Sequence, residues 1–215
     1  MSLADLRDRY LEAQLAGDRR EAMRIVVDEG LASGIEVIDL QTRVIQSAQN
    51  EIGRLWQQNR VTIAQEHMAS AISQLVLATL FERATPAKPL GKKLVLACVD
   101  GELHDLPARI VADVLDLVGF DVRYLGASVP HDDLVSLIRQ ERPDVIGLSV
   151  TMSFNVPSLR TAVERVRQVT QTPIFIGGHA THWSVNLAFE LDVEGAGTEP
   201  REIIATAKRL VGLAP

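Results

Sequence analysis

The chain has almost no cysteine, no concentration of positive charge and no long apolar run. Its single cysteine, Cys98, lies in an apolar stretch, so a disulfide framework is excluded and this side chain is expected to pack in a core. A formal net charge of −6 argues against a nucleic-acid binder. No segment reaches the roughly 20 apolar residues that a bilayer span needs, and no signal-peptide pattern opens the chain. We therefore expect a cytoplasmic protein that binds neither membranes nor DNA directly.

Two kinds of periodicity divide the 215 residues, of which 47% are apolar. Over residues 1–84 the apolar side chains recur at helical spacing, and capping signals at Asp18 and Thr62 begin two of the four expected helices. Two prolines within residues 85–90 cannot continue a helix. The sequence therefore predicts an N-terminal four-helix bundle, here called the cap, over residues 1–84, and a linker over residues 85–90.

Residues 91–215 predict an α/β domain. Apolar strands are expected at residues 94–99, 122–125, 145–150 and 174–176, with a weaker fifth at 193–196. Helices are expected between them. Near-continuous apolar strands joined by helices are typical of a parallel sheet covered on both faces. By analogy we expect a flavodoxin-like, Rossmann-type sheet, doubly wound and five-stranded.

The most informative stretch is Glu102-Leu103-His104-Asp105-Leu106-Pro107, which follows the first expected strand. Open parallel sheets bind ligands at the carboxyl ends of their strands, so a histidine on this loop lies where a ligand would sit. An acid two residues before the histidine can hold one ring nitrogen while the other nitrogen ligates a metal. His104 is therefore a candidate metal ligand, with Glu102 as its partner.

Small or polar residues also follow the third and fourth strands. Together these elements resemble the cobalamin-binding domain family, whose signature is Asp-x-His-x-x-Gly, then Ser-x-Leu, then Gly-Gly. Here they read Glu102-x-His104-x-x-Pro107, Ser149-x-Thr151 and Gly177-Gly178. A longer carboxylate, a proline and a threonine replace family residues, and none of these changes removes the histidine. The helical segment over residues 1–83 is similar to the cap of many family members. The glycine pair alone would equally suit a strand-to-helix turn.

The resemblance implies a bound cobalamin whose dimethylbenzimidazole tail is detached from the cobalt and buried in the α/β domain. His104 would then be the lower axial cobalt ligand, and Glu102 would fix its tautomer. Asp105 matches an additional aspartate found in corrinoid carriers. The residues implied to line the tail channel are Ser149, Thr151, Gly177 and Gly178.

A second pattern lies in the cap, where Trp56 is followed after nine residues by Glu66-His67. This spacing resembles the light-responsive, adenosylcobalamin-dependent regulators related to MerR-type repressors. The resemblance implies that Trp56, Glu66 and His67 surround the 5′-deoxyadenosyl group. The studied light sensors carry a histidine directly after the tryptophan, which ligates cobalt after illumination. This chain has Gln57 there, so within the cap only His67 could substitute.

The helix that follows Thr62 agrees with such a pocket. Its expected buried face consists of Ala64, Met68, Ala71, Ile72 and Leu75. The opposite face, with Glu66, Ser70, Ser73 and Leu77, lacks the lysines and arginines of an ordinary solvent face. We therefore expect this second face to contact a partner.

Two functions remain open. The favoured one is a stand-alone, adenosylcobalamin-dependent light sensor that regulates transcription through a partner protein, and a second copy of the chain is a further candidate partner in a homo-oligomer. The alternative is a corrinoid carrier that passes methyl groups, as methylcobalamin, to a methyltransferase. The chain is not expected to be an enzyme in its own right, although a carrier would be the corrinoid subunit of one. A cofactor-free receiver-like module is a weaker third reading, because the lysine expected on a later strand is missing.

Overall fold

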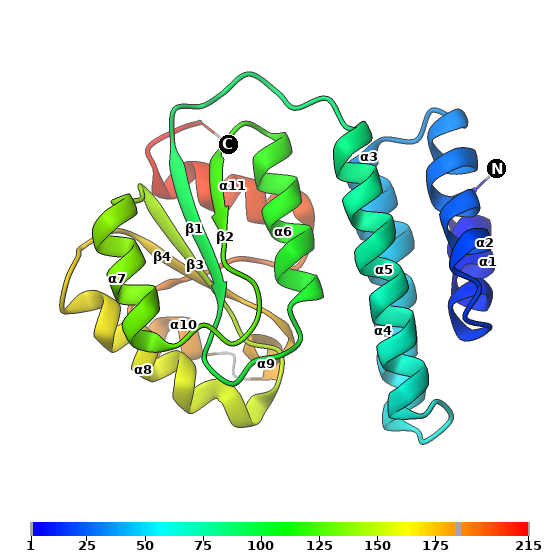
Figure 1. The fold of residues 1–215 in the computed structure, drawn as a ribbon. Helices are drawn as coiled ribbons and strands as arrows, with labels where there is room; N and C mark the ends of the chain where they lie inside the picture. The colour runs from blue at the N-terminus through cyan, green and yellow to red at the C-terminus, as the bar shows by residue number, and fades with distance from the viewer. Residues whose placement is uncertain (1, 184–185, 215) are drawn as a thin grey trace. The chain divides into compact units, whose positions relative to one another are not determined.

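A computed structural model describes residues 2–183 and 186–214, and the chain divides into two compact units, residues 1–85 and 86–215. The first unit is helical throughout its described part (Figure 1). Its four rods are α1 (Leu3–Leu15); α2 (Arg19–Met23) with η1 (Arg24–Gly30); α3 (Val37–Asp39) with η2 (Leu40–Gln46) and α4 (Ser47–Gln57); and α5 (Ile63–Arg83). The expected helical bundle is confirmed.

Two of these rods contain a π-helical stretch that the sequence pattern did not predict. In η1 and η2 the backbone N–H groups bond to the carbonyl five residues back instead of four. The two stretches pack against each other. Gly30, which ends η1, approaches Leu40 so closely that a Cβ atom on it would lie 2.8 Å from Leu40 Cδ2. The packing therefore requires a residue without a side chain at position 30.

The interior of the cap contains a cluster of polar side chains. The hydroxyl groups of Tyr10 and Ser73, both fully buried, lie 2.8 Å apart. The amide Nε2 of Gln14 donates to Ser73 Oγ at 2.8 Å and to the carbonyl of Ala69 at 3.0 Å. These hydrogen bonds give the buried Ser73 hydroxyl its partners. The side of α5 that carries Ser73 therefore faces the interior of the bundle.

The buried face of α5 consequently differs from the expected one. Met68 and Leu75 were expected inside, but they are 38% and 46% exposed, and of that expected face only Ile72 is buried. Ser73 and Leu77, expected on the partner-facing side, are fully buried. The prediction was wrong because the buried stripe of α5 lies one residue later in the sequence than expected, at Ala69, Ile72, Ser73, Val76, Leu77 and Leu80.

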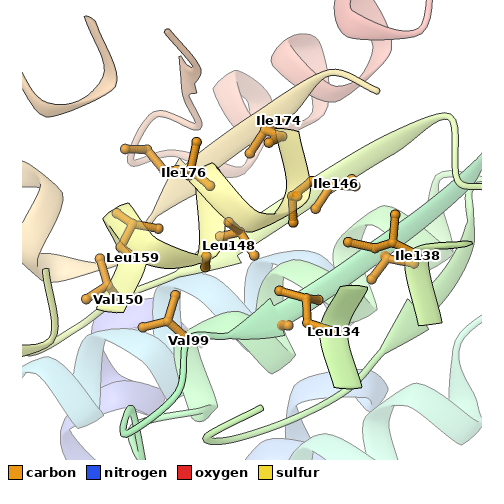
Figure 2. Close-up of a cluster of buried hydrophobic side chains, with 14 of the residues drawn as sticks. Val99, Leu134, Ile138, Ile146, Leu148, Val150, Leu159, Ile174 and Ile176 are labelled. Carbon is orange, nitrogen blue, oxygen red and sulfur yellow. The ribbon is translucent and has the colours of Figure 1, made fainter. Parts of the chain in front are cut away.

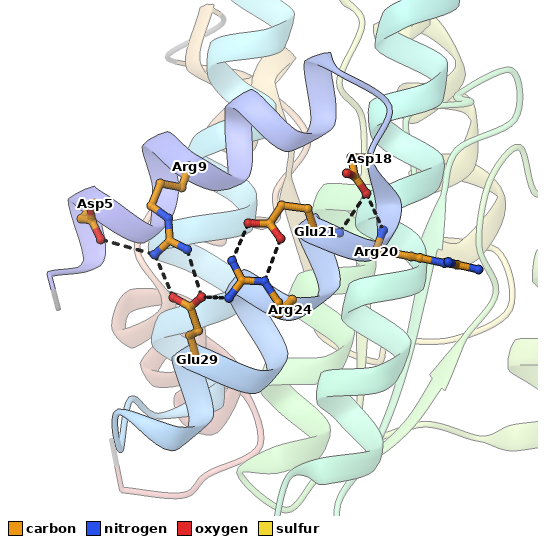
Figure 3. Close-up of polar contacts among 7 residues, drawn as sticks. All are labelled: Asp5, Arg9, Asp18, Arg20, Glu21, Arg24 and Glu29. Atoms are coloured by element: carbon orange, nitrogen blue, oxygen red, sulfur yellow. Dashed lines mark hydrogen bonds and ion pairs between the residues drawn. The ribbon is translucent and has the colours of Figure 1, made fainter.

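Ion pairs on the surface of the cap link α1 to the rod formed by α2 and η1 (Figure 3). The Glu29 carboxylate accepts hydrogen bonds from Arg9 Nη1 at 2.8 Å and Nη2 at 3.0 Å, and it also pairs with Arg24. Arg24 Nε donates to Glu21 at 2.7 Å. Asp18 caps α2 by accepting from the Glu21 backbone at 3.0 Å. The capping signal predicted that the Glu21 side chain would accept a hydrogen bond from the Asp18 backbone. Glu21 instead pairs with Arg24.

The second unit is an α/β domain (Figure 1). Its five parallel strands lie in the order β2-β1-β3-β4-β5, so the expected flavodoxin-like sheet is confirmed. The strands are β1 (Lys93–Cys98), β2 (Asp121–Tyr124), β3 (Val145–Ser149), β4 (Ile174–Gly177) and β5 (Glu194–Gly195). The helices are α6 (Leu106–Leu117), α7 (His131–Glu141), η3 (Ser153–Asn155), α8 (Val156–Arg167), α9 (His179–Trp183), α10 (Leu187–Glu190) and α11 (Pro200–Leu210). Across the described ranges, no helix combines the length and the apolar character that a membrane crossing demands.

Apolar layers cover both faces of the sheet. On one face, Ile146 and Leu148 of β3 pack with Leu134 of α7 and Leu159 of α8 (Figure 2). On the other face, α6 and α11 cover β1, β3 and β4. Because the central strands are parallel and buried on both sides, the loops that follow them emerge together at the carboxyl edge.

The two helical glycines of the cap offer a matched test of the contact between the π-helical stretches. A Cβ atom at Gly53 of α4 would meet nothing within 4 Å, in contrast to the crowded position at Gly30. Gly30→Ala should therefore lower the free energy of unfolding by about 1–3 kcal/mol through overpacking. Gly53→Ala should raise it by up to about 1 kcal/mol through helix propensity. Urea unfolding followed by circular dichroism measures both, and equal effects would contradict the close contact.

Candidate functional site

A short loop between β1 and α6 presents His104 at the carboxyl edge of the sheet. The backbone N–H of Glu102 donates to the Val99 carbonyl at 2.9 Å, which turns the chain directly after the strand. Pro107 lies in the first turn of α6, where its missing N–H costs nothing. The loop leaves the His104 side chain 45% exposed.

The carboxylate of Glu102 is fully buried behind this histidine and accepts five hydrogen bonds. Its Oε1 accepts from the backbone N of His104 at 2.9 Å and lies 2.7 Å from the ring Nδ1. Its Oε2 accepts from the backbone N of Thr151 and of Met152, both at 2.9 Å, and from Asn155 Nδ2 at 3.0 Å. One side chain therefore ties the loop after β1 to the segment after β3.

These bonds also fix the charge of the carboxylate. Burial acts to raise the pKa of Glu102, but the hydrogen bonds from His104, Met152 and Asn155 outweigh it and lower the pKa to about 2. The carboxylate is therefore ionised at neutral pH. An ionised acceptor places the imidazole proton on Nδ1, which leaves the Nε2 lone pair as the one that can ligate a metal. This donor set fits an axial ligand of cobalt.

Among the other predicted residues, Ser149 and Thr151 lie at the end of β3. Ser149 is buried beside Cys98, which follows from the pairing of β1 with β3. Burial raises the pKa of the Cys98 thiol to about 12, so this cysteine is protonated and packs in the core as expected. The Thr151 hydroxyl is buried without a hydrogen-bond partner among the described residues. Such an oxygen is suited to meet a polar group of a ligand.

The glycine pair after β4 has an internal role. Gly178 has φ +100°, and a Cβ atom on it would lie 2.3 Å from the Val150 carbonyl oxygen. Backbone geometry therefore requires Gly178 with or without a ligand. Gly177 has only an ordinary contact, at 3.4 Å to Ala196. The structure thus supports the turn reading for Gly178 and leaves the cofactor contact of both glycines a prediction.

Asn155 is a site residue that the sequence reasoning missed. Its buried side chain donates to Glu102 and, at 3.3 Å, to the Gly101 carbonyl. Nothing in the local pattern singles it out, because its partners lie more than 50 residues away in the sequence. Its only signal is that it follows the third strand, at the edge where ligands bind.

Asp105 lies next to His104 and is held by the edge strand. The Tyr124 hydroxyl donates to the Asp105 backbone carbonyl at 3.0 Å and lies 3.4 Å from its Oδ2. The side chain of Asp105 makes no capping bond to α6.

The predicted cap residues lie at adjoining helix ends, because α4 packs on α5 and a short turn joins them. Trp56 is near the end of α4. Glu66 and His67 are in the first turn of α5, where Glu66 Oε2 lies 2.6 Å from His67 Nδ1. The His67 side chain is 74% exposed. Glu66 Oε1 accepts from Ser70 Oγ at 2.8 Å, and this hydroxyl accepts from a glutamine of α4. The structure therefore joins two of the three predicted residues directly.

A helical bundle and a parallel sheet whose exposed histidine is backed by a buried carboxylate are the features that the resemblance to corrinoid-binding proteins implies. Comparisons of the sequence agree with that resemblance. Two family models, each described as a B12 binding domain, match residues 6–80 and 92–205. The chain belongs to the B12-binding domain family, and cobalamin binding is supported.

Relatives fall into two groups. The HTH-type transcriptional repressor CarH of Myxococcus xanthus is 31% identical over 159 residues, which cover 72% of this chain and 52%, about half, of the repressor. Dimethylamine corrinoid protein 2 of Methanosarcina acetivorans is 27% identical over 194 residues, or 86% of this chain and 81% of the relative. The monomethylamine corrinoid protein of Methanosarcina barkeri shares the fold, with a TM-score of 0.80 over 96% of this chain and 98% of that one at 17% identity. The resemblance to the regulators is confirmed, while both groups are compatible with the site.

Replacing Glu102 should change how the free energy of unfolding depends on pH, because this carboxylate is ionised in the folded protein. Its pKa falls from an ordinary 4.5 to about 2 on folding, so its ionisation stabilises the fold above pH 4.5 and this contribution is lost as the pH falls toward 2. Glu102→Gln should lower the free energy of unfolding by roughly 3 kcal/mol at pH 7. Urea unfolding at pH 7 and pH 2.5 tests this, with exposed Glu164→Gln as the control. A deficit of the same size at both pH values would contradict the prediction.

Proposed function

We propose that the protein is an adenosylcobalamin-dependent light sensor that regulates transcription through a partner protein. The observation that carries the proposal is the presence of two histidines, each bonded through Nδ1 to a glutamate: His104 with Glu102 in the α/β unit and His67 with Glu66 in the cap. The first pair matches the lower cobalt ligand of the family. The second pair, with Trp56, matches the pattern of the light-responsive regulators.

In this proposal His104 Nε2 would hold the cobalt, and Glu102 would fix the ring orientation and tautomer of His104. The buried Thr151 hydroxyl supports a tail channel at the end of β3, because an unsatisfied polar atom there gains a partner when a polar group is bound. Ser149, Gly177 and Gly178 would form the remaining wall of that channel. Asp105 would lie beside the axial ligand.

The cap residues would recognise the adenosyl group of the cofactor. Trp56 offers an aromatic surface for the adenine, and Glu66 offers a carboxylate oxygen to the ribose hydroxyl groups. Adenosylcobalamin supplies a cobalt–carbon bond that visible light can break. Trp56, Glu66 and His67 would hold the adenosyl group, and the preferred conformation of the cap would depend on those contacts. The conformation of the cap would in turn set the binding to a regulatory partner or to a second copy of the chain.

A corrinoid carrier for a methyltransferase is the second candidate. It is favoured by the match to a dimethylamine corrinoid protein over 86% of this chain and 81% of that relative. Asp105 also fits the carrier pattern. In this case the bound form would be methylcobalamin, and the partner would be the methyltransferase that performs the catalysis.

Reconstitution with adenosylcobalamin in the dark tests the proposal. We expect a red protein whose absorbance spectrum changes under green light and whose elution volume in size-exclusion chromatography shifts with it. His104→Ala should weaken cofactor retention by at least about tenfold, since it removes the cobalt ligand. His131→Asn is the control, because His131 bonds to Ser158 and is not a predicted cofactor contact.

The outcomes separate the two functions. A light-dependent change that Trp56→Ala or Glu66→Gln reduces would support the sensor. Retention of corrinoid with a spectrum that light does not alter would reject it. Methyl transfer from bound methylcobalamin to a partner enzyme would support the carrier instead. Failure of the unmodified protein to retain any corrinoid would overturn both.

A further inference from the structure

The loop that carries His104 is held from a second side by Ser128, which lies in the segment between β2 and α7. The backbone N–H of Gly101 donates to Ser128 Oγ at 3.0 Å. The backbone N–H of Ser128 donates in turn to the Glu102 carbonyl at 2.8 Å. One residue therefore binds two consecutive residues of the turn that leads to His104.

The remaining backbone groups of this turn also have partners. The Gly101 carbonyl accepts from Asn155 Nδ2 at 3.3 Å, and the Glu102 N–H donates to the Val99 carbonyl at 2.9 Å. The turn is thus bonded to its own strand, to the segment after β3 through Asn155, and to the segment after β2 through Ser128. Replacing the Ser128 hydroxyl would leave the Gly101 N–H without its acceptor.

The backbone of Ser128 adopts a conformation that a residue with a Cβ atom disfavours, with φ at +48°. Among the described residues, the others besides glycine with a positive φ are Asn59, Arg142 and Asp192. Asparagine and aspartate tolerate this conformation, and Arg142 follows the last residue of α7. Neither reason applies to Ser128, so its contacts must hold it there. Backbone strain of this kind persists where the surrounding structure fixes a functional arrangement.

The turn acts on His104 through Glu102. The Glu102 carbonyl is bonded to Ser128, while its carboxylate accepts from the His104 backbone N–H and lies 2.7 Å from the ring Nδ1. Both groups belong to one residue, so a shift of its backbone would also move the carboxylate. The bonds of Ser128 therefore restrict the direction of the imidazole.

We propose that Ser128 is a positioning residue for His104: its hydroxyl and its N–H hold Gly101 and Glu102 so that the imidazole keeps the orientation in which it binds cobalamin. The effect on cobalamin rests on the proposed function. The order of the turn is a property of the protein without cofactor.

Ser128→Gly tests the proposal, because it removes the hydroxyl and tolerates the left-handed backbone. Arg142→Gly is the matched control, since Arg142 is exposed and has the same φ of 48° at the far end of α7. The first measurement is hydrogen exchange of the Gly101 and His104 amides by nuclear magnetic resonance, in protein without cofactor. The second is the dissociation constant for adenosylcobalamin in the dark, with His104 present and in a His104→Ala background.

We expect Ser128→Gly to speed exchange of both amides by about fivefold to tenfold, the effect of losing one hydrogen bond. It should weaken adenosylcobalamin binding by a similar factor when His104 is present. In the His104→Ala background it should cause no further loss, because two residues that act through the same interaction are not additive. Arg142→Gly should change neither exchange nor binding.

Unchanged exchange of the His104 amide in Ser128→Gly would overturn the proposal. An equal loss of binding with and without His104 would overturn it too, because Ser128 would then act by another route. If circular dichroism shows that Ser128→Gly disturbs the fold, Ser128→Ala removes the same hydroxyl and is judged by the same criteria. Binding that His104→Ala leaves intact would refute the proposed cobalt ligand, whereas faster exchange without cofactor would still establish that Ser128 orders the turn.

Discussion

A buried negative charge organises the carboxyl edge of the sheet. Transferring a carboxylate from water into a protein interior is strongly unfavourable unless hydrogen bonds replace its hydration. Glu102 receives five of them, three from backbone N–H groups. The loop after β1 and the segment after β3 therefore depend on the same carboxylate. The direction of the His104 ring is a consequence of that mutual dependence.

The cap combines an apolar core with a buried polar cluster. The α/β unit has continuous apolar layers on both faces of its sheet, whereas the cap buries Tyr10, Gln14 and Ser73 among apolar side chains and includes two π-helical stretches. Because each hydrogen bond exists over a narrow range of angles, the bonds among these three residues fix the directions of their side chains.

The sequence predicted the features that depend on neighbours along the chain. The parallel sheet followed from apolar runs separated by helices, its flavodoxin-like order was expected by analogy, and the position of His104 followed from its place directly after a strand. The buried face of α5 was predicted one residue out of register, and the burial of Ser73 is not visible in the local sequence because its partner Gln14 is 59 residues away. Asn155 was missed for the same reason. The π-helical stretches were missed because a seven-residue window does not distinguish a period of 3.6 from a slightly longer one.

The single cysteine of the chain has a practical consequence. Cys98 is buried at the end of β1 and its thiol is protonated at neutral pH, so maleimides and nitroxide reagents have nothing to attack in the folded protein. Cysteines introduced at chosen surface positions would therefore be the sole points of attachment. One label in each unit would allow the distance between the two units to be measured in solution.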